Sequence, residues 1–266
     1  MEKMRIDRYL VERGLAPSRE RARAMIQAGQ VYVAGRQITK PAEAVAEDAV
    51  PEIRGEVLPF VSRGGLKLQK AVAAYALDLA GRVAMDVGSS TGGFTDCMLQ
   101  SGAGKVYAID VGTDQLHPSL REDPRVVVME QRNAREMTPD WFDETPDFAA
   151  TDVSFISVRL ILPAMYACLA PGGQAVILVK PQFEAGRSRV GKNGVVRDKR
   201  VHQEVLTETA QFAAALGFSV RALDYSPITG PEGNIEFLML LEKGNETALS
   251  IPDAAARVVN AAHEAL

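Results

Sequence analysis

Cysteine is scarce in this sequence of 266 residues, where only Cys97 and Cys168 occur. Each lies in an apolar run without the spacing of metal ligands, which excludes a disulfide framework and a cysteine-based metal site. We expect two buried thiols in a reducing cytosol, and therefore a cytoplasmic protein. Since 47% of the residues are hydrophobic, the chain can build a large core without disulfides or metals, and no metal is expected.

A membrane-spanning segment is also lacking. The segment from Leu160 to Val179 has no charged residue and is long enough to span a bilayer. Pro163 and the turn signal Pro171-Gly172-Gly173 interrupt it, however, and divide it into a helix and a buried strand. The first residues, MEKMRIDRYL, lack the apolar stretch of a secretion signal. We therefore expect no membrane insertion.

Excess positive charge is absent as well. The net charge of −4 excludes a uniformly basic nucleic-acid binder, but the charge is unevenly distributed. Residues 1–40 contain nine basic side chains and four acidic ones, whereas residues 41–60 contain five acidic side chains and a single arginine. A basic head on an acidic protein favours a localised anionic partner.

The head is predicted to contain two short helices and a hairpin. Apolar residues at helical spacing indicate one helix that ends at Gly14 and a second that begins after Ser18, a good N-cap. A turn at Ala34-Gly35 then joins two short strands. Arginines on the outward face could bind the phosphates of structured RNA, although an ordinary solvated face is the alternative. The candidate RNA contacts here are Arg5, Arg8, Arg19, Arg21 and Arg23.

Three motifs of the head are familiar: Arg5-Ile6-Asp7-Arg8-Tyr9-Leu10, Ser18-Arg19-Glu20-Arg21-Ala22 and Ala28-Gly29-Gln30-Val31-Tyr32-Val33-Ala34-Gly35. They resemble the S4 RNA-binding domain of ribosomal proteins and RNA-modifying enzymes. The resemblance covers roughly residues 4–60 and implies that this part of the chain delivers RNA and performs no chemistry. We therefore assign residues 1–60 to a small α+β domain of S4 type.

From about residue 65, apolar strands alternate with helical stretches, which predicts a mostly parallel sheet with helices on both faces. The link Tyr225–Asn234 is too short for a crossover helix, so the last strand should be antiparallel to its neighbour. This α/β pattern resembles the seven-stranded, Rossmann-like class I methyltransferase fold. We assign it residues 61–245, followed by a C-terminal helix or tail over residues 246–266. The predicted strands are Val83–Val87, Val106–Ile109, Val126–Met129, Phe148–Thr151, Ala175–Val179, Val220–Asp224 and Ile235–Leu241.

A glycine-rich loop, Asp86–Gly93, follows the first of these strands and lets the backbone approach a ligand closely. It resembles the loop of S-adenosylmethionine enzymes, although a glycine loop alone identifies a cofactor only weakly. Asp110 ends the next strand and could accept hydrogen bonds from a ribose diol. Asn133, after the third strand, is a candidate adenine contact or simply a turn residue. The candidate contacts of S-adenosyl-L-methionine are Asp86, Gly88, Ser89, Ser90, Thr91, Gly92, Gly93, Phe94, Asp110, Asn133 and Asp152.

Methyl transfer to a ribose hydroxyl requires that the hydroxyl be positioned and relieved of its proton. Lys67 begins the helix before the first strand, Asp152 and Lys180 end the fourth and fifth strands, and Glu236 lies in the seventh. A lysine with a lowered pKa is a better base toward an alcohol than an aspartate is. We expect Lys180 to be that base, Lys67 and Asp152 to orient the ribose, and Glu236 to hold a lysine. Structural ion pairing is the alternative.

This order of lysine, aspartate, lysine and glutamate closely resembles the FtsJ-like 2′-O-ribose methyltransferases. Together with the S4-like head, residues 4–243 resemble the hemolysin A (TlyA-type) family. The resemblance implies 2′-O-methylation of cytidine in ribosomal RNA, with ribosomal RNA or ribosomal subunits as partners. It also implies that the four residues are catalytic and that Asp86–Gly93 and Asp110 bind the cofactor.

A basic loop follows Lys180, and its position beside the proposed base favours an RNA contact over a merely solvated loop. Its candidate RNA contacts are Arg187, Arg189, Lys192 and Arg197. Two other functions stay open at this point. A membrane-active hemolysin is disfavoured by the interrupted apolar segment. An RNA-binding protein with an inactive methyltransferase domain is disfavoured by the complete set of four polar residues and the glycine loop.

Overall fold

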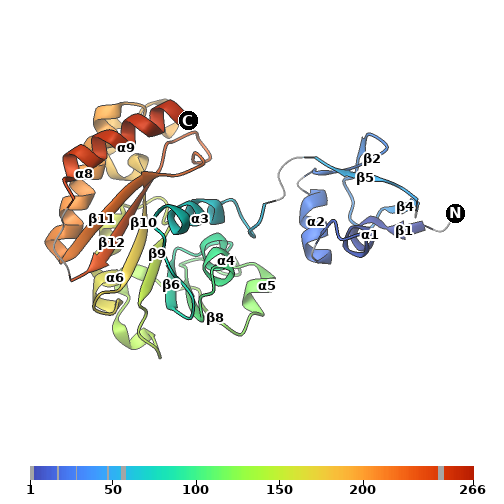
Figure 1. Ribbon diagram of the computed structural model, residues 1–266, viewed down its shortest axis with the longest axis horizontal. Helices are drawn as coiled ribbons and strands as arrows, with labels where there is room; N and C mark the ends of the chain where they lie inside the picture. Colours follow the sequence, from blue (N-terminus) through green and yellow to red (C-terminus); the bar gives the residue numbers. More distant parts are fainter. Residues whose placement is uncertain (1–2, 17, 28, 47, 55–57, 245–248) are drawn as a thin grey trace. The chain divides into compact units, whose positions relative to one another are not determined.

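The computed structural model describes residues 3–16, 18–27, 29–46, 48–54, 58–244 and 249–266; of residues 20, 21, 24 and 27 it describes the backbone only. The chain divides into two compact units, Met1–Leu58 and Pro59–Leu266. Figure 1 shows the smaller unit as short helices and strands, and the larger unit as a sheet between helices.

Two helices and five short strands form the described part of the smaller unit. The helices are α1 (Ile6–Glu12) and α2 (Arg19–Gln27), and the strands are β1 (Lys3–Arg5), β2 (Val31–Val33), β3 (Arg36–Gln37), β4 (Ala44–Ala46) and β5 (Pro51–Ile53). β1 pairs with β4, and β2 lies between β3 and β5, all in antiparallel fashion. Ile6, Leu10, Ala22 and Ile26 bring the two helices together in a small core.

The predicted hairpin in this unit is confirmed. Ala34 and Gly35 both have positive φ angles, 50° and 77°, which match the twist that a two-residue turn between antiparallel strands requires. The two helices are confirmed as well, since Gly14 follows the end of α1 closely and α2 begins directly after Ser18. The sequence pattern does not predict β1, β4 and β5, because three residues are too few to show an alternation and, unlike β2 and β3, these strands are not joined to a partner by a two-residue turn.

Seven strands form the sheet of the larger unit. They are β6 (Val83–Val87), β7 (Lys105–Ile109), β8 (Val126–Met129), β9 (Phe148–Thr151), β10 (Gln174–Val179), β11 (Phe218–Tyr225) and β12 (Phe237–Lys243). Their order is β11-β12-β10-β9-β6-β7-β8, and β12 runs antiparallel to both of its neighbours. The predicted mostly parallel sheet with an antiparallel last strand is confirmed.

Helices cover both faces of this sheet (Figure 1). One face packs against α3 (Gly64–Ala74), α4 (Gly93–Gln100) and α5 (Pro118–Arg121), and the other against α6 (Leu162–Cys168), α8 (Lys199–Leu216) and α9 (Ile251–Ala265). Met85 and Val87 of β6 belong to one core and Ala84 to the other, as the alternation of a strand requires. The remaining described helical segments are α7 (Pro181–Glu184), η1 (Ala134–Glu136), η2 (Pro139–Trp141), η3 (Val158–Leu160), η4 (Arg187–Arg189) and η5 (Lys192–Gly194).

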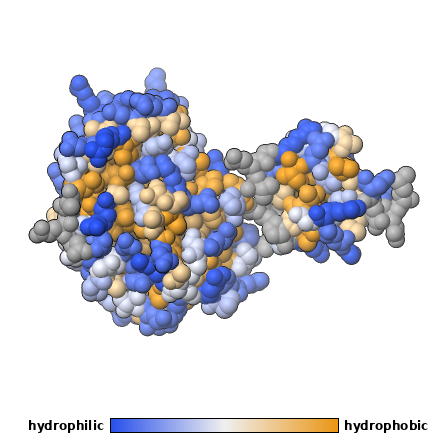
Figure 2. Space-filling view, in the orientation of Figure 1, coloured by the Kyte–Doolittle hydropathy of each residue, from blue (hydrophilic) through white to orange (hydrophobic). Residues whose placement is uncertain are grey.

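The charge-free segment from Leu160 to Val179 folds, as predicted, into a helix (α6) and a buried strand (β10). No helix within the described ranges is both long and apolar enough to cross a bilayer. Figure 2 shows hydrophilic residues around the periphery of the larger unit, with apolar residues between them. Cys97 and Cys168 are buried free thiols, as predicted.

Some predicted strand boundaries differ from the observed ones by one or two residues, and one of these differences concerns a candidate catalytic residue. Glu236 precedes β12 instead of lying within it. The strand begins at Phe237 because that residue faces Val179 on one side and Tyr225 on the other, and these two residues end β10 and β11. Glu236 therefore lies just outside the strand, where its backbone carbonyl still accepts a hydrogen bond from the N–H of Ser226 at 2.8 Å.

Candidate active site

A cavity of about 570 Å³ lies at the edge of the sheet where β6, β9 and β10 end. Lys67, Asp152, Lys180 and Glu236 all line it. Lys67 comes from the first turn of α3, Asp152 follows β9, and Lys180 follows β10. Because β12 runs antiparallel to β10, its beginning lies at the same edge as the end of β10. The topology thus brings together four residues that are far apart in the sequence.

These four side chains form one continuous chain of ion pairs. Glu236 Oε2 lies 2.7 Å from Lys67 Nζ, and Lys67 Nζ lies 3.1 Å from Asp152 Oδ2. The other oxygen of Asp152, Oδ1, lies 2.5 Å from Lys180 Nζ. The side chains are between 2% and 19% exposed, so the charges interact in a site that largely excludes water. Asp152 therefore links both lysines.

The electrostatics of Lys67 differ from the simplest expectation. Burial lowers the pKa of Lys67, because it disfavours the charged form. The carboxylates of Asp152 and Glu236 more than offset this effect and raise the pKa of Lys67 above its ordinary value. Lys67 is therefore a cation at neutral pH, which makes it a hydrogen-bond donor and excludes it as a base.

Sequence reasoning missed two residues beside these charges. Ser154 Oγ accepts a hydrogen bond from Lys180 Nζ at 2.8 Å. Phe155 is 88% exposed, has a φ of 67°, and lies with its ring centroid 5.5 Å from that of Phe183. Positive φ is rare for a bulky residue, and such strain concentrates at functional sites. The sequence offers no local signal for either feature, because both depend on the loop conformation after β9.

Glu184 determines the conformation of that loop. Its buried carboxylate accepts hydrogen bonds from Ser157 Oγ and from the backbone N–H of Val158, both at 2.6 Å. The residues that follow Asp152 are thereby tied to α7, which begins directly after Lys180. Asp152 and Lys180 are therefore held together by their own ion pair and by the hydrogen bonds of Glu184 to the loop after Asp152.

The glycine-rich loop forms another wall of the cavity. Gly88, Ser89, Ser90, Thr91, Gly93 and Phe94 line it together with Asp152, whereas Asp86 and Gly92 of the same loop, and Asp110 after β7, do not. Gly92 has a φ of 96°, and a Cβ there would overlap Leu120 and lie 2.8 Å from Leu116 Cδ1. This position therefore requires glycine.

Two polar atoms of this loop region are buried without a hydrogen-bond partner among the described residues: Asp86 Oδ1 and Ser89 Oγ. Burial raises the pKa of Asp86 to about 7, although hydrogen bonds from the Thr95 side chain and backbone N–H oppose the shift. Buried polar groups are usually satisfied. Asp86 does not line the cavity, but Ser89 does, so the Ser89 hydroxyl is available to a polar ligand there. The amino-acid end of S-adenosylmethionine, with its ammonium and carboxylate groups, fits that requirement.

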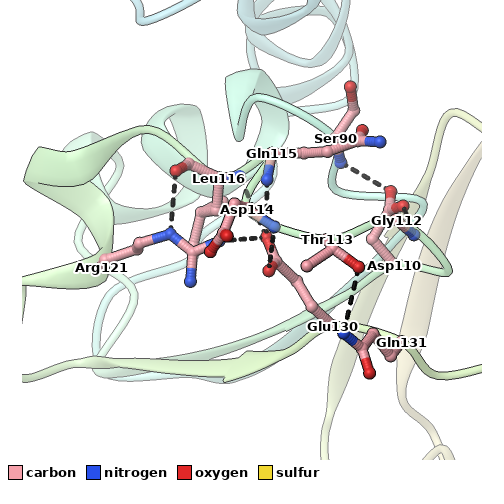
Figure 3. Close-up of polar contacts among 10 residues, drawn as sticks. All are labelled: Ser90, Asp110, Gly112, Thr113, Asp114, Gln115, Leu116, Arg121, Glu130 and Gln131. Atoms are coloured by element: carbon pink, nitrogen blue, oxygen red, sulfur yellow. Dashed lines mark hydrogen bonds and ion pairs between the residues drawn. The ribbon is translucent and has the colours of Figure 1, made fainter.

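Figure 3 shows how Asp110 is held next to this loop. Its carboxylate accepts hydrogen bonds from the backbone N–H of Ser90 at 2.8 Å and of Gly112 at 2.7 Å. A carboxylate has about four acceptor positions, so two stay open to a ribose diol. Glu130 supports the same region by accepting hydrogen bonds from three consecutive backbone N–H groups, those of Asp114, Gln115 and Leu116, and from Arg121.

Asn133 is engaged differently. It caps η1, where its Oδ1 accepts a hydrogen bond from the backbone N–H of Arg135 at 3.2 Å and its Nδ2 donates to Glu136 at 2.9 Å. Both ends of the amide are thus used within one turn, as the turn interpretation expects. An adenine contact would require one of these hydrogen bonds to be exchanged, and it stays a prediction.

The basic loop after Lys180 borders the cavity through Asn193 and Gly194. Asn234, beside Glu236, holds it with hydrogen bonds to Gly194 O at 2.9 Å and from the Val196 N–H at 3.0 Å. Arg187, Lys192 and Arg197 are exposed. Arg189 instead pairs with Glu204 at 2.6 Å, so its charge is partly neutralised.

In the smaller unit, three of the five candidate arginines converge on one acid. Arg5, Arg19 and Arg23 each place a nitrogen between 3.0 and 3.3 Å from Asp7 Oδ2. Arg8 pairs with Glu12 on the surface of α1 at 2.6 Å. The side chain of Arg21 is outside what the structure describes.

A glycine-rich loop after the first parallel strand, an acid after the second, and charged residues at the same sheet edge define a Rossmann-like methyltransferase that uses S-adenosylmethionine. Within the described ranges, no group of three His, Cys, Asp or Glu side chains could hold a metal ion. Residues 60–243 match the FtsJ-like methyltransferase family, and residues 4–50 match the S4 domain. The chain therefore belongs to the FtsJ-like methyltransferases and carries an S4 domain at its N-terminal side.

Individual proteins agree with this assignment. The chain is 49% identical to YqxC of Bacillus subtilis (strain 168), a candidate rRNA methyltransferase, over 100% of this chain and 96% of that protein. It is 42% identical to the 16S/23S rRNA (cytidine-2′-O)-methyltransferase TlyA of Mycobacterium tuberculosis (strain ATCC 25618 / H37Rv), over 96% of this chain and 97% of that one. A solved structure of a candidate hemolysin from Streptococcus thermophilus is 48% identical, with a TM-score of 0.78 over 100% of this chain and 97% of the other. The predicted family, fold class and methyl donor are confirmed.

Proposed function

We propose that this protein transfers the methyl group of S-adenosylmethionine to a ribose 2′-hydroxyl of cytidine in ribosomal RNA. The observation that carries the proposal is the chain of ion pairs from Glu236 through Lys67 and Asp152 to Lys180, in a cavity that the glycine loop also lines. The name of the Mycobacterium tuberculosis relative supports the choice of ribosomal cytidine. A ribosomal substrate also implies activity in the cytoplasm.

The cofactor supplies an electrophilic methyl group on a positively charged sulfur. Ser89, Ser90 and the backbone of the glycine loop would hold its amino-acid end, and Asp110 would accept hydrogen bonds from its ribose hydroxyls. The unsatisfied Ser89 Oγ and the two backbone N–H groups that orient Asp110 support these roles.

Lys180 acts as the general base in this mechanism. In its neutral form, its Nζ would take the proton of the 2′-hydroxyl, so that the hydroxyl oxygen could receive the methyl group that bound S-adenosylmethionine would supply with its sulfur as the leaving group. Ser154, which is exposed and hydrogen-bonded to Nζ at 2.8 Å, offers a route by which that proton reaches solvent. Lys67 stays protonated and donates a hydrogen bond to the ribose, while Asp152 and Glu236 hold the two lysines in place.

RNA binding is assigned to two basic surfaces and one aromatic residue. The first surface is the cluster of Arg5, Arg19 and Arg23, and the second is the loop with Arg187, Lys192 and Arg197. Both are exposed enough to meet phosphates. Phe155, exposed at the rim of the cavity, could stack on a base next to the reacting ribose.

The test is to incubate the purified protein with unmodified ribosomal subunits and radiolabelled S-adenosylmethionine, with Lys180→Ala as the control. We expect label in a cytidine whose 3′-phosphodiester resists alkaline hydrolysis, as a 2′-O-methylated ribose does. Label on a base would overturn the proposed chemistry. Cofactor binding without any methylation of either subunit would favour an RNA-binding protein with an inactive domain.

A further inference from the structure

Asp7 is a buried acid among arginines that are expected to bind RNA. Its side chain is fully buried, whereas the side chains of Arg5, Arg19 and Arg23 are each about half exposed, at 47%, 52% and 51%. An acid in an RNA-binding surface is unfavourable by charge alone, since it repels phosphate. Its presence at the centre of the arginine cluster therefore needs a physical reason.

The contacts of Asp7 give that reason. Arg5 donates from Nε to Oδ1 at 3.1 Å and from Nη2 to Oδ2 at 3.0 Å, which is a two-point contact of defined orientation. Arg19 Nη2 and Arg23 Nε, four residues apart on α2, donate to the same Oδ2 at 3.1 and 3.3 Å. The carboxylate thus draws three guanidinium groups from two elements to one point. The hydrogen bond from Arg5, with help from Arg19 and Arg23, holds the pKa of Asp7 below its ordinary value, so the acid stays charged.

The cluster keeps most of its capacity for phosphate. Three guanidinium groups and one carboxylate carry a net charge of +2. Each guanidinium has five N–H donors, of which Arg5 uses two on Asp7 and Arg19 and Arg23 use one each. Free arginines would lose side-chain entropy when they bind RNA, but arginines already ordered by Asp7 lose less.

We propose that Asp7 is a positioning residue that pre-orders Arg5, Arg19 and Arg23 as a clamp for adjacent phosphates of the RNA backbone. The proposal rests on the assignment of RNA binding to these arginines. Asp7 contributes to affinity although its own charge opposes binding, because the ordering of three donors outweighs one unit of repulsion. If Asp7 only stabilised the fold, the RNA affinity of a folded Asp7 variant would depend only on its charge.

Asp7→Asn separates these possibilities, because the two models predict opposite signs. Neutralising Asp7 raises the net charge by one, so charge alone predicts tighter RNA binding. Loss of the clamp predicts affinity weaker by about tenfold, the effect of leaving several long side chains unordered. The matched control is Glu52→Gln, which makes the same charge change at an exposed acid that pairs with Arg54 and not with the cluster. This control should bind RNA as tightly as the parent or slightly more tightly.

The experiment measures binding of a fluorescein-labelled RNA hairpin to the full chain by anisotropy over a series of salt concentrations. Thermal unfolding and S-adenosylmethionine affinity are followed in parallel, and Asp7→Ser is used if Asp7→Asn does not fold. Asp7→Asn binding at least as tightly as Glu52→Gln would overturn the clamp. The double variant Arg19→Gln/Arg23→Gln tests whether these arginines bind RNA at all. If its RNA affinity and salt dependence are unchanged, the assignment of RNA binding to this surface is wrong, whatever the result for Asp7→Asn.

Discussion

Replacement of Lys180 gives the sharpest test of the catalytic assignment. Its Nζ contacts Asp152 Oδ1 at 2.5 Å and Ser154 Oγ at 2.8 Å inside the cavity. Loss of a general base reduces kcat by about 10²–10⁴-fold, which corresponds to about 3–5 kcal/mol of activation free energy. Lys180→Ala should show a loss in this range. Lys180→Arg should lose as much activity, because a guanidinium keeps the charge but does not release its proton at any working pH.

The folded state should tolerate both changes. Without Lys180, Asp152 still has Lys67 Nζ at 3.1 Å, so no carboxylate is left without a cation. S-adenosylmethionine and RNA affinities should change by no more than about threefold, since binding and proton removal use different groups. Lys70→Ala is the matched control: Lys70, on α3, is likewise a lysine in an ion pair, with Asp224 at 2.9 Å, but it does not line the cavity.

The assay is single-turnover methyl transfer to ribosomal RNA across a range of pH, with cofactor affinity measured by calorimetry. The rate for the parent protein should rise with pH, because only a neutral amine accepts a proton. If Lys180→Arg retained most of the activity with an unchanged pH profile, Lys180 would only position the substrate and the base assignment would be wrong.

Three further predictions concern the cofactor region and a buried histidine of α8. Asp110→Ala should weaken S-adenosylmethionine binding by about tenfold to a hundredfold, because it removes charge-assisted hydrogen bonds. Gly92→Val should abolish binding, because a side chain there is strained and overlaps Leu120. If calorimetry gave both variants the affinity of the parent protein, the cofactor would bind elsewhere. Glu130→Gln should loosen the backbone at Asp114–Leu116 and raise the KM for S-adenosylmethionine several-fold at unchanged kcat, and a lower kcat at unchanged KM would contradict this. Burial, and then His263, lower the pKa of His202 from 6.5 to about 4 in the folded state, so the unfolded chain takes up the proton first. The stability contributed by neutral His202 should be complete above pH 6.5 and fall by about 3 kcal/mol as the pH drops through 4. In denaturant unfolding, the free energy of unfolding of His202→Gln should depend less steeply on pH in this window. An equally steep dependence would refute the assignment.

The sheet of the larger unit could be predicted almost completely from the sequence. Its strands are short apolar runs bounded by Gly, Pro and Asp, so their existence and order follow from local patterns. The exact start of β12 could not be predicted, because Phe237 is defined by its partners Val179 and Tyr225. Strands β1, β4 and β5 of the smaller unit could not be predicted for the same reason, since they are defined by their pairing.

The membership of the charged site could be predicted, but its contacts could not. Strand ends and the glycine loop indicate which residues reach the sheet edge. That Asp152 contacts both lysines, or that Lys180 also contacts Ser154, depends on a loop held by Glu184. The arginines of the smaller unit are a similar case: the sequence shows their number, whereas the structure reveals that a buried acid gathers three of them.

The arrangement of charges supports the different roles that we propose for the two lysines in the cavity. Lys67 has two carboxylates within 3.1 Å of its Nζ, whereas Lys180 shares one carboxylate with Lys67 and has a neutral hydroxyl as its second partner. Loss of a proton from Lys180 leaves Lys67 as the one cation beside Asp152 and Glu236, so these three groups carry a net charge of −1. The resulting negative charge complements a sulfonium donor in the same cavity. Lys180, the lysine with fewer carboxylate contacts, is therefore the one that we propose as the base.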